Sequence, residues 1–268
     1  MSTSEELKKY SQETIDTVEG FCLFDDNFMS LVFERNIEAT ELLLNIILER
    51  DDMKVTEVVG QREYKNPEYG GRSIRVDIYA KDSAGKVYDV EVQRSDAGAD
   101  VHRARFNSSM LDTRMLKAKQ NFKEMHESYV IFITENDVMG DGLPLYHIDR
   151  VIRENGKSFH DGSHIIYVNG SYKNDEDPVG RLMHDFGCRR ASDMFYTELA
   201  NQVKYYKETE GGREIMCKAV DDLAENRRLD SLAECIKNLM ETMTLTLEEA
   251  MNALKVTEAD RKVLSKRL

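Results

Sequence analysis

The chain has 268 residues, of which 41% are hydrophobic and 32% are charged, and its formal net charge is −13. This length allows one large domain, or one domain with an appendage, and the apolar content is too high for a wholly disordered chain. The few prolines exclude collagen-like and proline-rich classes, and the negative charge makes a nucleic-acid-binding protein a poor default expectation.

The hydrophobic pattern also bears on cellular location. The longest apolar run, residues 42–48, is interrupted by Asn45 and falls far short of the 18 residues that indicate a transmembrane helix. Residues 1–16 are polar and acidic, unlike a secretory signal. The four cysteines are scattered, which is typical of reduced cytosolic thiols. We therefore expect a cytoplasmic protein with no membrane partner.

Residues 23–48 are predicted to be helical because apolar residues recur at intervals of three and four. Asp25 or Asp26 is suited to cap the start of this helix, and a break near residues 34–37 would give two shorter helices. β-Branched residues then alternate through residues 55–64, which predicts a strand.

A β-hairpin is the most clearly marked element. Residues 73–81 and 86–93 alternate around a short turn that contains glycine. If the turn is centred on residue 84, opposed residues have numbers that sum to 168, so Asp77 would face Glu91. Their Cβ atoms would lie about 4.5–5.5 Å apart, which is unfavourable unless a group such as a divalent cation neutralises the two charges.

The same spacing has a more common explanation. Antiparallel hairpins often have one face exposed to water, and Arg75 or Lys81 could balance the carboxylates as ordinary cross-strand pairs. From spacing alone this second interpretation is the more frequent one.

The elements after the hairpin complete the predicted sheet. Residues 99–127 are expected to form a long helix, and the apolar run 129–134 is expected to form a strand buried on both faces. Further strands are expected near residues 145–152 and 164–168. Strands and helices in this order predict an α/β fold with a mixed sheet.

From residue 191 onward the pattern is helical. A helix over 191–208 is expected to end at Gly211 and Gly212, and Thr246 and Thr257 begin sequences of the capping-box type. We place a boundary near residue 190, with domains at 20–190 and 191–268. The apolar spacing in the second region predicts packing against the first domain or, alternatively, a homodimer.

The acidic pair lies in a wider pattern that resembles a known family. Asp77 followed by Glu91-x-Gln93 resembles the core motif of the PD-(D/E)XK nuclease superfamily, in which Asp is followed by Asp or Glu, any residue, and Lys. Together with flanking segments, the pattern resembles the PD-(D/E)XK nuclease family transposases, related to the recombination-promoting nucleases, over roughly residues 20–190. These segments are Phe28-Met29, Val32-Phe33, Arg75-Val76-Asp77-Ile78, Asp89-Val90-Glu91-Val92-Gln93 and Arg103-Ala104-Arg105-Phe106.

This resemblance implies a restriction-endonuclease-like mixed sheet flanked by helices, and a DNA endonuclease that depends on Mg²⁺ or Mn²⁺. Asp77 and Glu91 would be the metal ligands, and Gln93 would replace the lysine that orients or activates the attacking water. The first-helix acid of the superfamily could correspond to Asp26, Glu38 or Glu41, and the neighbouring phenylalanine favours Asp26.

Two departures from the family pattern affect the expected activity. Val76 replaces the proline before Asp77, and Gln93 replaces lysine; glutamine can neither carry a charge nor act as a general base. The alternative function is therefore a catalytically decayed nuclease fold that binds DNA or protein.

A local excess of basic residues could allow DNA binding despite the negative net charge of the chain. Residues 102–123 contain six Lys or Arg and one Asp, so this segment carries 6 − 1 = +5. Arg103, Arg105 and Lys117 are predicted to contact DNA phosphates. A solvated helix face explains the same charges, and the net charge alone would favour an interaction protein with no nucleic-acid role.

Overall fold

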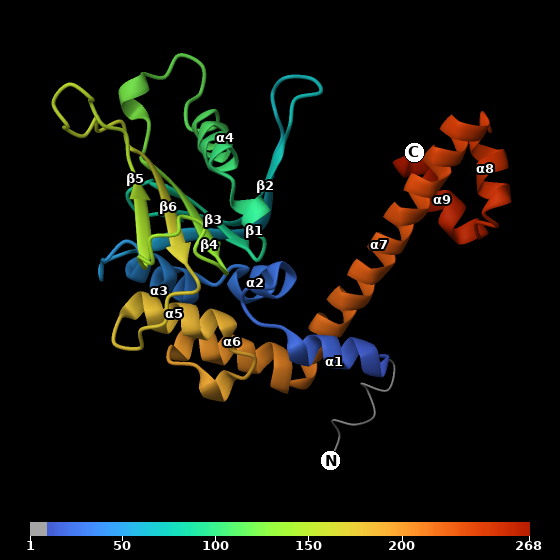
Figure 1. The fold of residues 1–268 in the computed structure, drawn as a ribbon, viewed down its shortest axis with the longest axis horizontal. Coiled ribbons are helices and arrows are strands. Elements are labelled where there is room, and N and C mark those ends of the chain that lie inside the picture. Colours follow the sequence, from blue (N-terminus) through green and yellow to red (C-terminus); the bar gives the residue numbers. More distant parts are fainter. Residues whose placement is uncertain (1–9) are drawn as a thin grey trace. The chain divides into compact units, whose positions relative to one another are not determined.

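The computed structural model describes residues 10–268, whose larger part is built around one mixed β-sheet (Figure 1). Within these residues the sheet has six strands in the order β1-β2-β3-β4-β6-β5. Pairing is antiparallel along β1-β2-β3, parallel along β3-β4-β6, and antiparallel between β6 and the edge strand β5. The strands are β1 (Val55–Tyr64), β2 (Ile74–Asp82), β3 (Val87–Gln93), β4 (Ser128–Thr134), β5 (Leu145–Ile148) and β6 (Ser163–Asn169).

Helices cover both faces of the sheet. Helix α4 (Val101–Asp112) packs on β4 and β6 from one side, and α2 (Asp26–Phe33) and α3 (Ile37–Ile47) pack on the first strands from the other (Figure 1). Helices α5 (Pro178–Gly187) and α6 (Thr197–Glu208) form a further layer behind α2 and α3. This arrangement confirms the predicted restriction-endonuclease-like α/β fold.

The expected break in the first helical segment is confirmed. Helix α2 ends at Phe33, Arg35 has a φ of 54°, and Asn36 caps α3 by accepting a hydrogen bond from the Ala39 N–H. Asp25 occupies the N-cap position of α2, although its side chain accepts instead from the Cys22 N–H.

The hairpin has the predicted register. Its pairs run from Ile78 with Val90 to Lys81 with Val87, and each pair of numbers sums to 168. The turn is closed by Asp82, whose Oδ1 accepts hydrogen bonds from the N–H groups of residues 84 and 86. The interpretation as a half-exposed hairpin is wrong, because helices on both sides of the sheet leave nearly all of β3 buried.

The helix predicted over residues 99–127 is wrong in its second half. Helix α4 ends at Asp112, and residues 113–127 form a loop that holds only a short 3-10 turn, Phe122–Glu124. Phe122 is 83% exposed, and Lys119 has a φ of 73°. Within this described loop, only Met115, just after the helix, packs against the core of the sheet, and without such packing further along, the helix does not continue. Lys117 therefore lies in an exposed loop.

The glycine pair does not end a helical region as predicted. Helix α6 ends at Glu208, and α7 (Glu210–Met243) begins two residues later and contains both glycines. A Cβ on Gly212 would overlap the carbonyl oxygen of Tyr205, so the missing side chain permits this tight junction.

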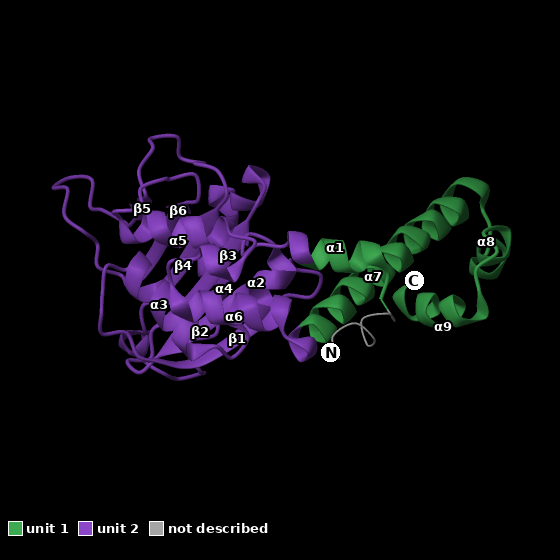
Figure 2. Cartoon of the chain, turned by 90° about the horizontal axis from the view of Figure 1, so that it is seen from below, with its two compact units in different colours: residues 1–18, 213–268 green, residues 19–212 purple. Residues whose placement is uncertain are grey.

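The chain divides into two units, residues 19–212 and residues 213–268 together with the described residues up to Val18 (Figure 2). The larger unit includes α6 and so extends past residue 190, where the sequence placed the boundary. In the smaller unit, α1 (Gln12–Gly20) meets α7 where the Thr14 hydroxyl donates to Asp221 over 2.8 Å.

The apolar residues of α7 have partners within the smaller unit. Leu229 and Ile236 of α7 share a core with residues of α8 (Leu247–Ala253) and α9 (Glu258–Arg267), which include Met251 and Leu264. The predicted capping box at Thr246 starts α8. These helices bury their apolar faces against one another, and a homodimer stays a prediction. No helix in the described part of the chain is long and apolar enough to cross a membrane.

Candidate active site

Three acidic side chains from the hairpin are buried on the sheet face that α4 covers. Asp77 lies on β2, and Asp89 and Glu91 lie on β3, two residues apart and therefore on the same face. Asp77 is 6% exposed, and Asp89 and Glu91 are completely buried. Buried carboxylates are rare unless they are paired or hold a metal, so this cluster marks a site.

The two strands cease to pair at the site. The ladder between β2 and β3 ends at Ile78 and Val90, one residue before Asp77 and Glu91 would have been opposed. The Asp77 carboxylate accepts a hydrogen bond from the Val92 N–H over 3.1 Å. The Asp77 carboxylate thus takes the place of a backbone carbonyl as the acceptor for this N–H group, and the hydrogen bond holds the Asp77 side chain against β3.

The carboxyl groups oppose one another's ionisation. Burial raises the pKa of Asp77 to about 8, and repulsion by Glu91 and by Asp26 adds to this effect. Burial, followed by repulsion from Asp89, raises the pKa of Glu91, while the positive charge of Arg103 lowers it. Burial also raises the pKa of Asp89. The three carboxyl groups are therefore stabilised when they bind protons or a metal cation.

Two side chains of α4 contact the carboxylates. The Arg103 guanidinium donates to Glu91 Oε2 and, over 2.9 Å, to the Gly98 carbonyl. One helical turn later, the Asn107 amide donates to Asp89 Oδ2 over 3.0 Å and to Glu91 Oε1 over 3.4 Å. We expected Arg103 to meet DNA, whereas in this structure it neutralises part of the acidic cluster.

Three buried oxygen atoms among the described residues have no hydrogen-bond partner, and all of them belong to this region. They are Oδ1 of Asp26, Oδ1 of Asp89 and Oδ1 of Asn107. An unsatisfied buried polar atom costs about 1–3 kcal/mol. Carboxylate and amide oxygens are ligands that hard divalent cations prefer, so the donor set fits such an ion.

The carboxylates do not all converge on one point. Among the described residues, no three of these acids bring ligand atoms within 4.8 Å of one another. A site of this kind suits an ion that keeps water and substrate oxygens in its coordination shell, as Mg²⁺ usually does with one or two carboxylates.

Of the three candidates for the first-helix acid, Asp26 is the one whose charge affects the cluster. It raises the pKa of Asp77, and its Oδ2 lies 3.9 Å from the Arg75 guanidinium. Glu41 instead accepts a hydrogen bond from the Val55 N–H over 2.9 Å, and Glu38 is exposed. The assignment of Asp26 as the first-helix acid stays a prediction.

Gln93 lies at the end of β3 and is half-buried. Alternation places it on the same face as Glu91. Its amide oxygen lies against Gly98, where a Cβ would overlap it. The other predicted DNA contact on α4, Arg105, is exposed and has no ion pair within the described region.

Two members of the cluster, Asp89 and Asn107, were not predicted as site residues, although Asp89 stands in the segment that resembles the family. Asp89 could have been found by alternation, because it lies two residues before Glu91. Asn107 could have been found from its position four residues after Arg103, which places both side chains on one helix face.

A second group of possible metal ligands has a structural explanation. Ligand atoms of His184, Asp185 and Cys188 lie within 4.8 Å of one another. However, both oxygens of the buried Asp185 accept backbone N–H groups, from Phe195 and Tyr196, over 2.8 Å. Burial also raises the pKa of the Cys188 thiol to about 11, which disfavours the thiolate that a metal needs. The group ties the end of α5 to the start of α6.

Comparison with known proteins identifies the family. A model of the PD-(D/E)XK nuclease family transposases matches residues 30–174, which is 145 of 268 residues. The chain belongs to this family. The match contains every cluster residue except Asp26, which precedes it by four positions. No curated protein and no solved structure gave a match.

Family membership supports a nuclease-like function. PD-(D/E)XK nucleases generally use divalent metals, and a nuclease family implies DNA as the substrate. The buried carboxylates and unsatisfied oxygens described above are the features of this chain that suit such chemistry.

Proposed function

We propose that this family member is a metal-dependent DNA endonuclease that hydrolyses phosphodiester bonds with Mg²⁺ or Mn²⁺. The observation that carries the proposal is the burial of Asp77, Asp89 and Glu91 in one cluster with an unsatisfied oxygen on Asp89. Such burial raises the free energy of the ionised cluster, and a divalent cation is the group that would lower it.

Asp77 and Glu91 would hold the ion, and Asp89 Oδ1 is available as a further ligand. When bound, the ion supplies acidified water and stabilises the negative charge that develops on the phosphate. Gln93, at the edge of the cluster, would orient the attacking water, since its amide both donates and accepts hydrogen bonds.

Arg103 has a role that depends on whether Glu91 is neutralised by another cation. In the structure its side chain is 37% exposed and its guanidinium pairs with Glu91. A cation on Glu91 would weaken this pair and leave the guanidinium available for a substrate phosphate. Arg105 and Lys117, both exposed, are proposed as further phosphate contacts.

Plasmid cleavage tests the proposal. We expect purified protein to nick supercoiled DNA in Mg²⁺ or Mn²⁺, and Asp77→Asn and Glu91→Gln to lower the rate by about 100-fold or more. Asp51→Asn is the matched control, because Asp51 is exposed and lies outside the cluster. Cleavage by Asp77→Asn at the wild-type rate would exclude the assignment.

The observation that favours a second function, binding without cleavage, is Gln93 itself, because it supplies no positive charge and no general base. Calorimetric titration with Mn²⁺ separates the two functions. Saturable binding that Glu91→Gln abolishes supports the endonuclease. DNA affinity without any metal binding supports the binding module.

A further inference from the structure

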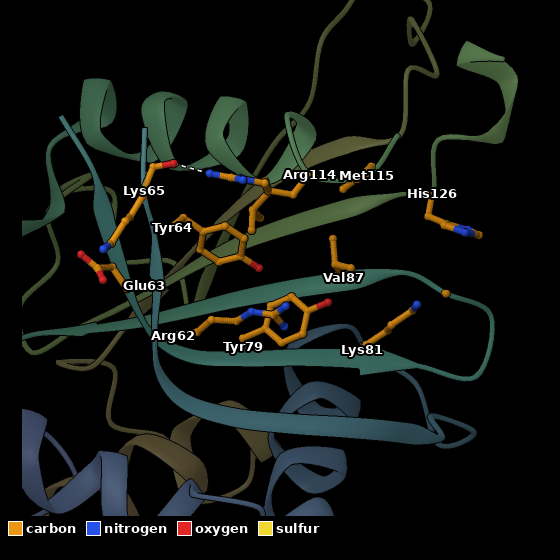
Figure 3. Close-up of a pocket in the computed structure, with 12 residues that line it drawn as sticks. Arg62, Glu63, Tyr64, Lys65, Tyr79, Lys81, Val87, Arg114, Met115 and His126 are labelled. Carbon is orange, nitrogen blue, oxygen red and sulfur yellow. Dashed lines mark hydrogen bonds between the residues drawn. The ribbon is translucent and has the colours of Figure 1, made fainter. Parts of the chain in front are cut away.

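A second feature of the α4 face of the sheet is a cavity of about 480 Å³ near the hairpin turn (Figure 3). We propose that this cavity binds phosphate groups of the nucleic-acid strand that lies across the carboxylate cluster. The inference rests on the proposed function and assigns part of the substrate-binding surface. It uses none of the positions predicted from the sequence to contact DNA.

The lining of the cavity is cationic. It includes Arg62, Lys65, Lys81 and Arg114 against one acid, Glu63, so these residues sum to 4 − 1 = +3 in a chain of −13. Within the described residues, Arg62 pairs with Glu57 over 3.2 Å, whereas Lys65, Lys81 and Arg114 have no carboxylate within ion-pair distance. A local concentration of unpaired positive charge in an acidic protein favours an anionic ligand.

Two tyrosines form the floor of the cavity. The Arg62 guanidinium lies 4.0 Å from the ring centre of Tyr79 and 5.4 Å from that of Tyr64, which fixes both rings. Figure 3 shows both hydroxyls pointing toward Val87, in the middle of the lining. Burial raises the pKa of Tyr79, so its hydroxyl keeps its proton and can donate to an anion.

The rim of the cavity is fixed before any ligand binds. The Arg114 guanidinium, just after α4, donates to the Lys65 carbonyl, just after β1 (Figure 3). On the opposite side, the His126 ring lies against Gly85 of the hairpin turn, where a Cβ would meet it at 2.7 Å. A preformed cationic site loses less entropy on binding than a set of mobile side chains.

The position of the cavity indicates a polymer rather than a free nucleotide. Tyr79 and Lys81 follow Asp77 at about 7 and 13 Å along β2. Tyr79 is also paired with Asp89 in the hairpin register. A nucleic-acid strand carries one charge about every 3.4 Å of helix axis, so a strand of a few nucleotides is long enough to reach from the edge of the cluster to the cavity.

Binding to a fluorescent DNA oligonucleotide in EDTA tests the proposal without cleavage. The double variant Lys81→Gln, Arg114→Gln should bind about tenfold more weakly, and the slope of log affinity against log salt should fall by about two. The matched control Lys119→Gln, Lys123→Gln removes the same charge from the exposed loop outside the cavity. It should bind as the wild type does.

The outcomes separate this inference from the proposed function. If the wild type binds DNA and the cavity variant binds equally well, the cavity proposal is wrong and the endonuclease proposal stands. If the cavity variant loses affinity but the wild type never cleaves DNA, the cavity proposal stands and the endonuclease proposal is wrong. Competition by deoxythymidine monophosphate as strong as that by the oligonucleotide would overturn the assignment to a strand, and a wild type that binds no DNA would overturn both proposals.

Discussion

Removing the charge of Asp77 should make the metal-free protein more stable while it lowers the rate of the proposed DNA cleavage. The substitution Asp77→Asn keeps the shape of the side chain and an oxygen that can accept from the Val92 N–H, as Asp77 does over 3.1 Å. It removes an ionisable group whose pKa is raised by burial and by two neighbouring acids. Stability and activity should therefore change in opposite directions.

The sign and size of the effect follow from the pKa of Asp77, raised from 3.8 to about 8. Between these values the folded chain holds the proton and the unfolded chain releases it, so the free energy of unfolding falls as pH rises. The stabilisation is complete below pH 3.8 and is lost by about pH 8. At 1.36 kcal/mol for each pH unit, the roughly three units between 3.8 and 7 correspond to about 4 kcal/mol.

Urea unfolding in EDTA, followed by circular dichroism, measures this difference. At about pH 7 the Asn variant should exceed the wild type by up to about 4 kcal/mol, and near pH 4 the two should be alike. Asp51→Asn, on the exposed surface, should follow the wild type at every pH. An Asn variant with no gain at about pH 7, or a gain that does not shrink toward pH 4, would refute the reasoning.

Three further predictions concern the metal, the water and the fold. Mn²⁺ should raise the thermal midpoint more at about pH 8 than at about pH 6, because the ligands must lose protons to bind it; equal shifts in calorimetry would contradict this. Gln93→Lys should speed plasmid cleavage by roughly tenfold at unchanged Mn²⁺ affinity, and no gain would place residue 93 away from the attacking water. Gly212→Ala should cost about 1–3 kcal/mol in guanidinium unfolding, since its Cβ would overlap the Tyr205 carbonyl. Gly211→Ala, whose Cβ would lie 3.9 Å from the Tyr205 hydroxyl, should be neutral or slightly stabilising, and equal losses in both would disprove this account.

The hairpin and its register could be predicted from the sequence because they depend on local geometry. Side chains alternate at every residue of a strand, and a tight turn fixes which residues are opposed, so the sum of 168 followed from the position of the turn. The break before α3 and the capping box at Thr246 were predictable for the same reason, since a cap involves only its own first turn.

Only the tertiary structure decided which segments pack against the sheet and which side chains come into contact. The sheet covers α4, whereas most of residues 113–127 are exposed, so a helix predicted as one element ends at Asp112. Arg103 and Asn107 reach Glu91 because α4 packs on β4, the strand next to β3. Asp26 comes near Asp77 because α2 packs on β2. Contacts of this kind join elements that are distant in sequence, and no local pattern of spacing or charge encodes them.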